Sequence, residues 1–164
     1  ERMYAIAFVT DSDCITLYLA INTYEYMNKK DHEYIELLQD KLSKEYIKKV
    51  KEGSCSITKW NPAEWGYSDE SNSNLAEVSK LLFSEEEDNP AEYEKNIDLF
   101  FEAVTSAFQR LIQFKVFGQD LEEVTYFISI SDDERTYEIE NFSAKLLNSE
   151  NIYKKFLERS EEYQ

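Results

Sequence analysis

Two apolar runs separated by a short polar turn constrain the fold of this chain more than any other feature. Residues 4–10 are apolar on both alternating faces, as is typical of a central β-strand. Residues 15–21 follow and alternate large aliphatic side chains with smaller or polar ones. The turn between them is Asp11-Ser12-Asp13. This pattern predicts an N-terminal β-hairpin.

Helical periodicity dominates the middle of the chain. After a short helix capped by Asn22 or Thr23, apolar residues recur every fourth position from about Glu33 and stop at Gly53, which predicts an amphipathic helix with a lysine-rich outer side. Pro90 begins the longest stripe, which we expect to form the main core helix across the sheet and to end at Gly118. That stripe consists of Tyr93, Ile97, Phe100, Phe101, Val104, Phe108, Leu111 and Ile112.

The remaining segments complete a mixed pattern. Residues 54–59 and 124–130 are predicted strands, and 136–139 is a candidate short return strand. Shorter amphipathic helices are expected around 75–82, around 142–147 and after Ser149. The order of elements predicts a single α+β domain over residues 1–164, with a largely antiparallel twisted sheet covered by amphipathic helices.

The charge of the chain is strongly acidic and unevenly distributed. Eighteen basic and 34 acidic residues give a net charge of −16. Residues 29–51 carry seven lysines against five acids, whereas residues 61–164 carry 24 acids against nine basic residues. Such a surface repels nucleic acid and anionic lipid and attracts basic proteins. The alternative is that the charge only keeps the protein in solution.

Few residues could form a catalytic or cofactor site. His32 is the only histidine, Cys14 and Cys55 lack zinc or redox spacing, and the three glycines are isolated, so there is no phosphate-binding loop. We therefore expect no cofactor and no assembled catalytic set. No apolar run approaches the ~20 residues of a membrane span, and we expect a cytoplasmic protein that does not bind membranes.

Carboxylates are the one chemical group in ample supply. Asp11 and Asp13 in the first turn can converge with Asp132 and Asp133, which follow the late strand, at one edge of the sheet. Such a cluster would bind a divalent cation or perform acid/base catalysis. Because none of these residues has the spacing of a calcium loop, solvated turns are the competing interpretation.

Residues 60–67, Trp-Asn-Pro-Ala-Glu-Trp-Gly-Tyr, contain both tryptophans of the chain. As a structural motif, Trp60, Pro62, Glu64, Trp65 and Tyr67 would form a rigid corner that closes one end of the sheet. As a surface, the outer members would contact a partner, because tryptophan and tyrosine dominate binding hot spots. The candidate partner-binding residues are Glu64, Trp65, Tyr67, Asp69, Glu70, Glu85, Glu86, Glu87 and Asp88.

The chain resembles a bacterial domain-of-unknown-function family, number 4303. The resemblance rests on the strand at 4–8 with its Thr-Asp turn, the 60–67 motif, the 124–131 segment with Asp132, and the late Leu147-Asn148 pair. Family members share a Trp-Ser-Pro-Ala-Glu-Trp signature, and Asn61 here takes the place of the serine, which preserves a cap or turn role. The resemblance implies an α+β fold and no defined chemistry. In size and acidity such proteins are also similar to immunity proteins of toxin systems, including the Smi1/Knr4-like group.

These observations lead to one principal hypothesis and two alternatives. The principal hypothesis is a non-enzymatic binding protein, such as an immunity protein that neutralises a basic toxin or nuclease. The first alternative is a carboxylate-based enzyme or divalent-metal-binding protein. The second is an acidic mimic of DNA, against which the lysine-rich helix counts.

Overall fold

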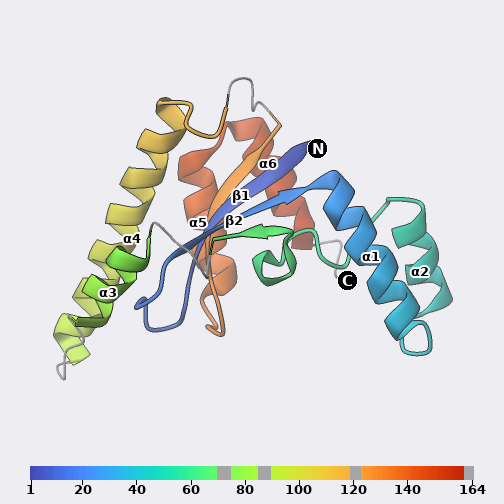
Figure 1. The fold of residues 1–164 in the computed structure, drawn as a ribbon, viewed down its shortest axis with the longest axis horizontal. Coiled ribbons are helices and arrows are strands. Elements are labelled where there is room, and N and C mark those ends of the chain that lie inside the picture. The colour runs from blue at the N-terminus through green and yellow to red at the C-terminus, as the bar shows by residue number, and fades with distance from the viewer. Residues whose placement is uncertain (70–74, 85–89, 119–122, 161–164) are drawn as a thin grey trace.

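The fold is built on a four-stranded sheet with helices on both faces (Figure 1). The computed structural model describes residues 1–69, 75–84, 90–118 and 123–160. The strands are β1 (Met3–Thr10), β2 (Tyr18–Thr23), β3 (Tyr67–Ser68) and β4 (Thr125–Ile130), in the spatial order β3-β2-β1-β4. β1 pairs with β2 antiparallel and with β4 parallel, and β3 pairs with β2 antiparallel. The expected α+β fold with a mostly antiparallel sheet is therefore confirmed.

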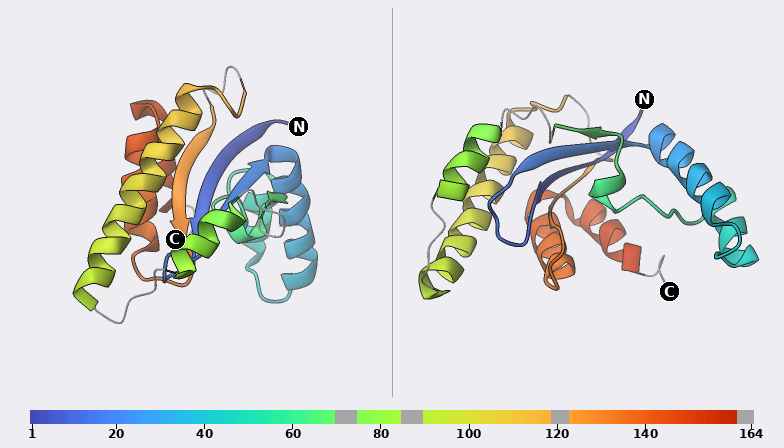
Figure 2. Two further views of the ribbon diagram at one scale, coloured as in Figure 1. Left: turned by 60° about the vertical axis from the view of Figure 1, so that its left-hand side comes forward. Right: turned by 60° about the horizontal axis from the view of Figure 1, so that its bottom comes forward.

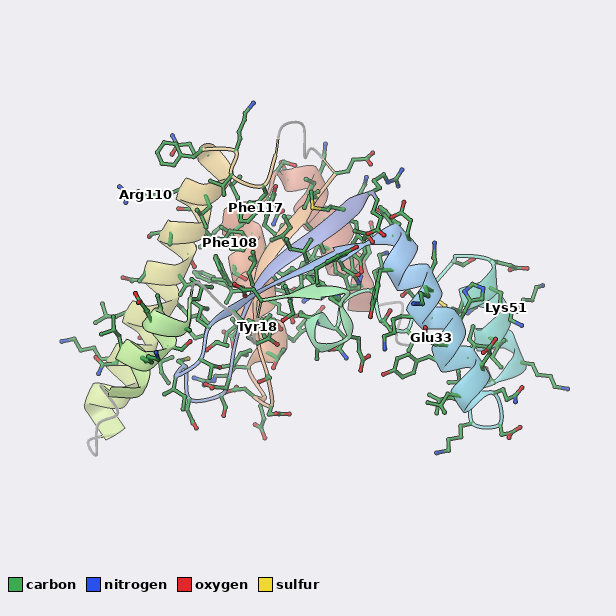
Figure 3. The ribbon with its side chains drawn as sticks, viewed as in Figure 1. Tyr18, Glu33, Lys51, Phe108, Arg110 and Phe117 are labelled. Carbon is green, nitrogen blue, oxygen red and sulfur yellow. The ribbon has the colours of Figure 1, made fainter. Side chains whose placement is uncertain are left out.

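The helices extend on either side of this sheet (Figures 1 and 2). α5 and α6 lie together against one side of the sheet, α3 and α4 lie at one end of the molecule, and α1 and α2 form an arm at the other end. Glu33 and Lys51 lie on this arm (Figure 3). The helices are α1 (Tyr24–Leu38), α2 (Lys44–Lys51), α3 (Ala76–Ser84), α4 (Pro90–Gln113), α5 (Thr136–Leu147) and α6 (Glu150–Leu157), with short 3₁₀ turns at Pro62–Glu64 and Glu158–Ser160.

The central strand β1 is buried on both faces, as its sequence predicts. One face packs with α4, whose inner side chains include Phe108, which lies 4.6 Å from the Phe8 ring, centroid to centroid (Figure 3). The other face carries Ala5 and Ala7, whose small side chains leave room for the aromatic rings of the 60–67 motif and of α6. The long helix thus occupies the core position expected from its apolar stripe, through Ile97, Phe100, Val104 and Phe108.

The outer edge of β4 is closed by side chains of α5 and its flanks instead of by another strand. Asn148 imitates a neighbouring peptide: its Oδ1 accepts from the Tyr126 N–H at 2.8 Å, and its Nδ2 donates to the Tyr126 carbonyl at 2.6 Å. Ser143 Oγ accepts from the Ile128 N–H at 2.9 Å, and Thr136 Oγ1 donates to the Ile130 carbonyl at 2.9 Å. These side chains therefore pair, within the chain, most of the backbone groups that an edge strand would leave open.

Asn148→Ala is expected to lower the free energy of unfolding by about 2–3 kcal/mol, because it leaves both buried backbone groups of Tyr126 without a partner. Urea denaturation followed by circular dichroism measures this change. The exposed Asn151 of α6 offers a matched control, and Asn151→Ala should shift stability by less than about 0.5 kcal/mol. Equal effects of the two substitutions would contradict the structural role of Asn148.

The strand predicted at residues 54–59 is wrong, because this segment is irregular and the third strand lies at Tyr67–Ser68. Its backbone is held by a buried carboxylate and not by a neighbouring strand. Asp31 Oδ1, on α1, accepts from the Ile57 N–H at 3.1 Å, from the Thr58 N–H at 3.0 Å and from the Thr58 hydroxyl at 2.9 Å. β-Branched residues here indicated a strand, but tertiary contacts decided the backbone conformation.

Two further predictions need correction. The return strand expected at 136–139 is the first turn of α5. The helix expected between Glu33 and Gly53 is divided, since α1 begins at Tyr24 and ends at Leu38, and α2 begins after Ser43, whose Oγ accepts from the Tyr46 N–H at 3.1 Å. A serine cap inside a continuous apolar period is the signal that separates the two helices. The long helix begins at Pro90 as expected but ends at Gln113, before Gly118.

Candidate functional site

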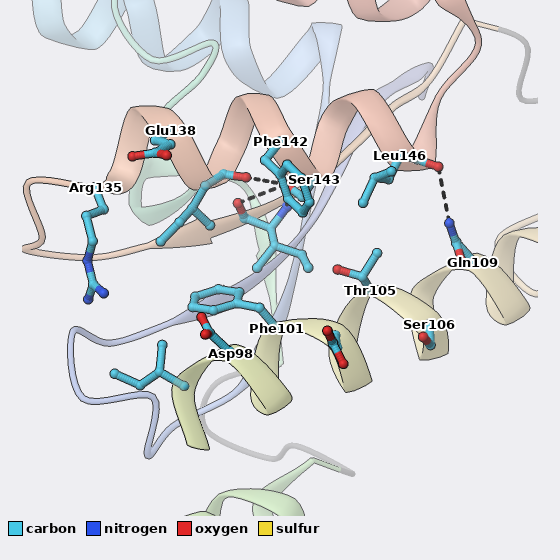
Figure 4. A pocket seen from close by; sticks show the side chains of 14 residues that line it. Asp98, Phe101, Thr105, Ser106, Gln109, Arg135, Glu138, Phe142, Ser143 and Leu146 are labelled. Atoms are coloured by element: carbon cyan, nitrogen blue, oxygen red, sulfur yellow. Dashed lines mark hydrogen bonds between the residues drawn. The ribbon is translucent and has the colours of Figure 1, made fainter. Parts of the chain in front are cut away.

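A groove lies between α4 and α5 (Figure 4). Its volume is about 660 Å³, within the range of sites that bind small ligands or partner side chains. The two helices form its walls and Ile128 of β4 lies at its floor. Ile97, Asp98, Phe101, Glu102, Thr105, Ser106 and Gln109 line it from α4, and Arg135, Glu138, Ile139, Phe142, Ser143 and Leu146 line it from α5 and the residue before it.

Large apolar side chains of the groove are exposed. Phe142 is 63% exposed and Leu146, one helical turn further along α5, is 45% exposed. Phe101 faces them from α4 and is half-buried (Figure 4). A contiguous apolar surface of this kind on a folded protein is characteristic of a binding site, because leaving it in water is unfavourable.

Unpaired carboxylates border this apolar surface. Asp98 and Glu102 lie one turn apart on α4 and Glu138 lies on α5, and all three are exposed. Within the described part of the chain, none of these three carboxylates has a hydrogen-bond or ion-pair partner. Arg135 does not neutralise them, because its guanidinium forms a two-point ion pair with Asp133, with Nε at 2.9 Å from Oδ1 and Nη2 at 2.6 Å from Oδ2. The groove therefore combines an apolar surface with a net negative border.

The Asp133–Arg135 pair has a clear electrostatic consequence. The Arg135 guanidinium and backbone N–H, both of which donate to the Asp133 carboxylate, lower the pKa of Asp133 from 3.8 to about 2. Asp133 therefore stays ionised and holds the side chain of Arg135, which lies at the same end of the groove as Asp98 (Figure 4).

The two acidic turns meet at one end of the sheet, as their positions in the sequence suggest. β1 and β4 are parallel neighbours, and the Ser131 N–H donates to the Thr10 carbonyl at 2.9 Å just beyond them. Asp11 is engaged in its own turn, where its carboxylate accepts from the Ile15 N–H and the Thr16 hydroxyl. Asp133 is engaged by Arg135.

No metal cluster is found at these turns. Asp13 and Asp132 are exposed, and within the described ranges no group of three or more His, Cys, Asp or Glu side chains is placed to hold a metal ion. Burial, followed by the charge of Asp11, raises the pKa of the nearby Cys14 thiol to about 11, so this cysteine stays protonated and unreactive.

The 60–67 motif packs against the sheet face opposite α4. Trp65 is only 6% exposed, its ring meets Phe127 at 5.7 Å between centroids, and its Nε1 donates to the Lys59 carbonyl at 3.2 Å. Trp60 is half-buried and lies edge-on to Phe156 of α6 at 5.0 Å. The two indoles thus join the sheet to α6.

Gly66 is required by a close contact next to this pair. A Cβ atom at position 66 would lie 2.6 Å from ring atoms of Tyr26, which is on α1. Any side chain at position 66 would therefore force the Tyr26 ring to move. Pro62 is buried, and Asn61 caps the short 3₁₀ turn by accepting from the Ala63 N–H at 3.3 Å. Asn61 therefore has the cap role that was expected from its position in the motif, where the family signature has serine.

The outer members of the motif lie on the surface but are not free. Glu64 is 3.7 Å from the Lys30 ammonium, and its hydrogen bond to Tyr34 raises the pKa of that phenol. The hydroxyl of Tyr67, which is 47% exposed, donates to the carboxylate of Glu1. Asp69 extends the pairing of β2 with β3, because its Oδ1 accepts a hydrogen bond from the Leu19 N–H at 2.8 Å.

Four of the expected partner-binding residues, Glu64, Trp65, Tyr67 and Asp69, lie in the part of the chain that the structure describes. Trp65 offers little surface in this conformation, whereas Glu64, Tyr67 and Asp69 lie around the β3 side of the sheet. Glu70 and residues 85–88 lie outside the described residues. The single His32 is exposed, with its Nδ1 at 2.6 Å from the Asn28 carbonyl oxygen.

Sequence reasoning missed the groove because it expected only a short amphipathic helix around residues 142–147 and placed residues 136–139 in a strand. The sequence of α5 did contain an indication of a second contact surface. Its apolar side chains cover more of the helix circumference than one buried face does; they are Ile139, Phe142, Ala144, Leu146 and Leu147. Ala144 and Leu147 are buried, whereas Phe142 and Leu146 turn toward the groove. An apolar set wider than one face on a short helix indicates a second contact surface.

Comparison with known proteins identifies the family. Residues 1–149 match the family described as Domain of unknown function (DUF4303), so the chain belongs to this family and the resemblance of the 60–67 motif is confirmed. No curated protein and no solved structure shows significant similarity to the chain. Among the described helices, none is both long and apolar enough to cross a membrane.

Proposed function

We propose that this member of the DUF4303 family is a non-enzymatic protein-binding module, and that its α4–α5 groove binds a basic protein partner. One observation carries the proposal: exposed Phe142 and Leu146 lie beside unpaired Asp98, Glu102 and Glu138 in a single hollow. Apolar side chains supply affinity when they are buried, and surrounding charges select the partner and raise the association rate.

The acidity of the whole chain supports a basic partner. A net charge of −16 attracts cationic proteins at long range, and the carboxylates of the groove then act at contact. An immunity protein that neutralises a basic toxin or nuclease is the specific form of this proposal. We place the binding in the cytoplasm, in keeping with two free cysteines, Cys14 and Cys55.

The proposal is tested by mixing the protein with a basic nuclease encoded beside its gene and measuring the dissociation constant at increasing salt. A tight complex that weakens as salt rises is expected. The double variant Glu102→Lys with Glu138→Lys should weaken the complex about tenfold or more, because it reverses the charge at both walls of the groove.

A matched control separates the groove from total charge. Glu36→Lys with Asp40→Lys changes the net charge by the same amount at exposed positions of the α1–α2 arm. It should change the dissociation constant by only about twofold, through long-range attraction. Equal weakening by the two double variants, or no complex at low salt, would overturn the proposal.

A further inference from the structure

We propose that the groove recognises its partner as a single amphipathic α-helix of about three turns, with an apolar stripe flanked on both sides by Lys or Arg. This inference rests on the proposed function and specifies the form of the partner. Phe101, Phe142 and Leu146 receive the apolar stripe. The carboxylates on the two walls receive the flanking cations.

The shape of the groove matches a helix. α4 and α5 run side by side in the same direction along it, with Asp98 and Arg135 at one end and Gln109 and Leu146 at the other (Figure 4). Gln109 Nε2 donates to the Leu146 carbonyl at 3.3 Å and closes that end. One wall runs from Asp98 to Gln109 and the other from Arg135 to Leu146. At ~1.5 Å per residue each wall is about 16 Å long, which is the length of about three helical turns.

The hydrogen bonding of the floor excludes an extended partner segment. A peptide that adds a strand needs open backbone groups at a sheet edge. At β4 most of these groups are already paired: Asn148 pairs the N–H and carbonyl of Tyr126, Ser143 pairs the N–H of Ile128, and Thr136 pairs the carbonyl of Ile130. A strand in the groove would leave its own backbone unpaired, whereas a helix pairs its backbone internally.

The carboxylates also have the spacing that a helix requires. Asp98 and Glu102 are four residues apart on α4, about 6 Å along the axis, and therefore match cations four residues apart on a neighbouring helix. Glu138 projects from the opposite wall, so cations on the other flank of the apolar stripe have a partner as well. Charge complementarity thus selects a helix that is basic on both sides of its apolar stripe.

The test uses a synthetic fluorescein-labelled peptide of about 14 residues, with leucine at one helical face, lysine on both flanks and alanine elsewhere. A peptide of the same composition in scrambled order is its control. Fluorescence anisotropy at about 0.15 M salt should show binding of the amphipathic peptide, and about tenfold weaker binding of the scrambled one. Circular dichroism should show helix formation on binding.

Two double variants locate the contact. Phe142→Ala with Leu146→Ala should weaken peptide binding about tenfold, because both exposed anchors are lost. Phe114→Ala with Val116→Ala removes comparable apolar surface, 75% and 60% exposed, outside the groove, and should leave binding unchanged. Because all four side chains are exposed, these variants should keep the fold, which circular dichroism verifies.

The outcomes distinguish this inference from the proposed function. If a basic nuclease binds at the groove but the amphipathic peptide binds no better than the scrambled one, the helical mode is wrong and the function stands. Equal losses in the two alanine double variants would also overturn the helical mode. If neither the nuclease nor the peptide binds at low salt, both proposals fail.

Discussion

Replacing Trp65 with alanine is expected to lower the free energy of unfolding by about 3–5 kcal/mol. The indole is 6% exposed, and it lies edge-on to Tyr4 at 6.3 Å and to Phe127 at 5.7 Å. The hydrogen bond from its Nε1–H to the Lys59 carbonyl would also be lost, although the Tyr4 hydroxyl still donates to that carbonyl at 2.7 Å, so most of the cost is lost packing. Urea denaturation followed by circular dichroism gives the free energy directly. The fluorescence of Trp60, the only other tryptophan, reports on the same face of the sheet.

Two comparisons make this prediction specific. Trp65→Phe keeps an aromatic ring but loses the hydrogen bond, and should cost about half as much. Tyr67→Ala changes a side chain that is 47% exposed in the same motif, and should cost less than about 1 kcal/mol. A small effect of Trp65→Ala, similar to that of Tyr67→Ala, would show that the motif does not clamp the fold.

Replacing Arg159 with methionine is expected to cost about 3–5 kcal/mol at neutral pH, because it leaves a buried carboxylate without its cation. Arg159 is 3% exposed, its Nη2 lies 3.2 Å from Glu140 Oε2, and its guanidinium lies 3.6 Å above the Phe156 ring. The pair ties the 3₁₀ turn after α6 to the middle of α5. Ser129 of β4 donates to the other oxygen of Glu140 at 2.7 Å.

The cost should depend on pH in a defined direction. Burial raises the pKa of Glu140 above its ordinary value of 4.5, and the opposing effects of Ser129 and Arg159 do not cancel it. The folded state therefore binds the proton more tightly than the unfolded state. The stability that Glu140 contributes is complete below pH 4.5 and decreases as pH rises through the raised pKa. Loss of Arg159 removes a group that lowers this pKa, so the destabilisation should shrink as pH falls and Glu140 becomes protonated.

Denaturation of the wild type and of Arg159→Met at several pH values between about 5 and about 8 measures this dependence. The range stays above the isoelectric point of about 4.4, where the protein would lose its net charge. The double variant Glu140→Gln with Arg159→Met should recover a large part of the stability and lose most of the pH dependence. A cost independent of pH, or a double variant no more stable than Arg159→Met alone, would contradict this account.

These stabilising contacts also define the groove. α5 is attached to β4 by Asn148, Ser143 and Thr136 and to the chain after α6 by the Glu140–Arg159 pair, while α4 is attached to the sheet through its aromatic core residues. Both walls of the groove are thereby positioned before any partner arrives. A preorganised site of this kind loses less conformational entropy on binding.

Local patterns in the sequence were sufficient where one element dominates its own environment. The apolar patterns of residues 4–10 and 124–130 identified β1 and β4, and the stripe after Pro90 identified α4. They failed at residues 54–59 and 136–139, where β-branched residues indicated strands. At residues 57–58 the distant Asp31 side chain pairs the backbone N–H groups. Residues 136–139 form the first turn of α5, and the Thr136 hydroxyl joins that turn to the Ile130 carbonyl at the end of β4. Intrinsic strand preference is weak enough for such contacts to override it.

For the candidate site too, the sequence predicted the general character and the tertiary structure decided the location. The sequence indicated an acidic, partner-directed surface and an aromatic motif, but it placed the contact around residues 60–67 and the acidic segments nearby. In the structure Trp65 is buried in that motif, and the exposed aromatic surface beside unpaired carboxylates lies between α4 and α5. Phe142 and Leu146 could not be assigned to this surface from their spacing alone, because a buried helix face has the same period.

The sequence by itself determined the α+β class, the family, the acidic character and the principal strands and helices, because these follow from composition, local periodicity and a short specific motif. Only the tertiary structure decided that Asn148 closes a sheet edge, that Trp65 faces inward, and that α5 presents Phe142 outward beside Asp98 and Glu102. The physical reason is that burial and hydrogen-bond pairing depend on which distant segments meet in space, and the sequence pattern of a single segment does not contain that information.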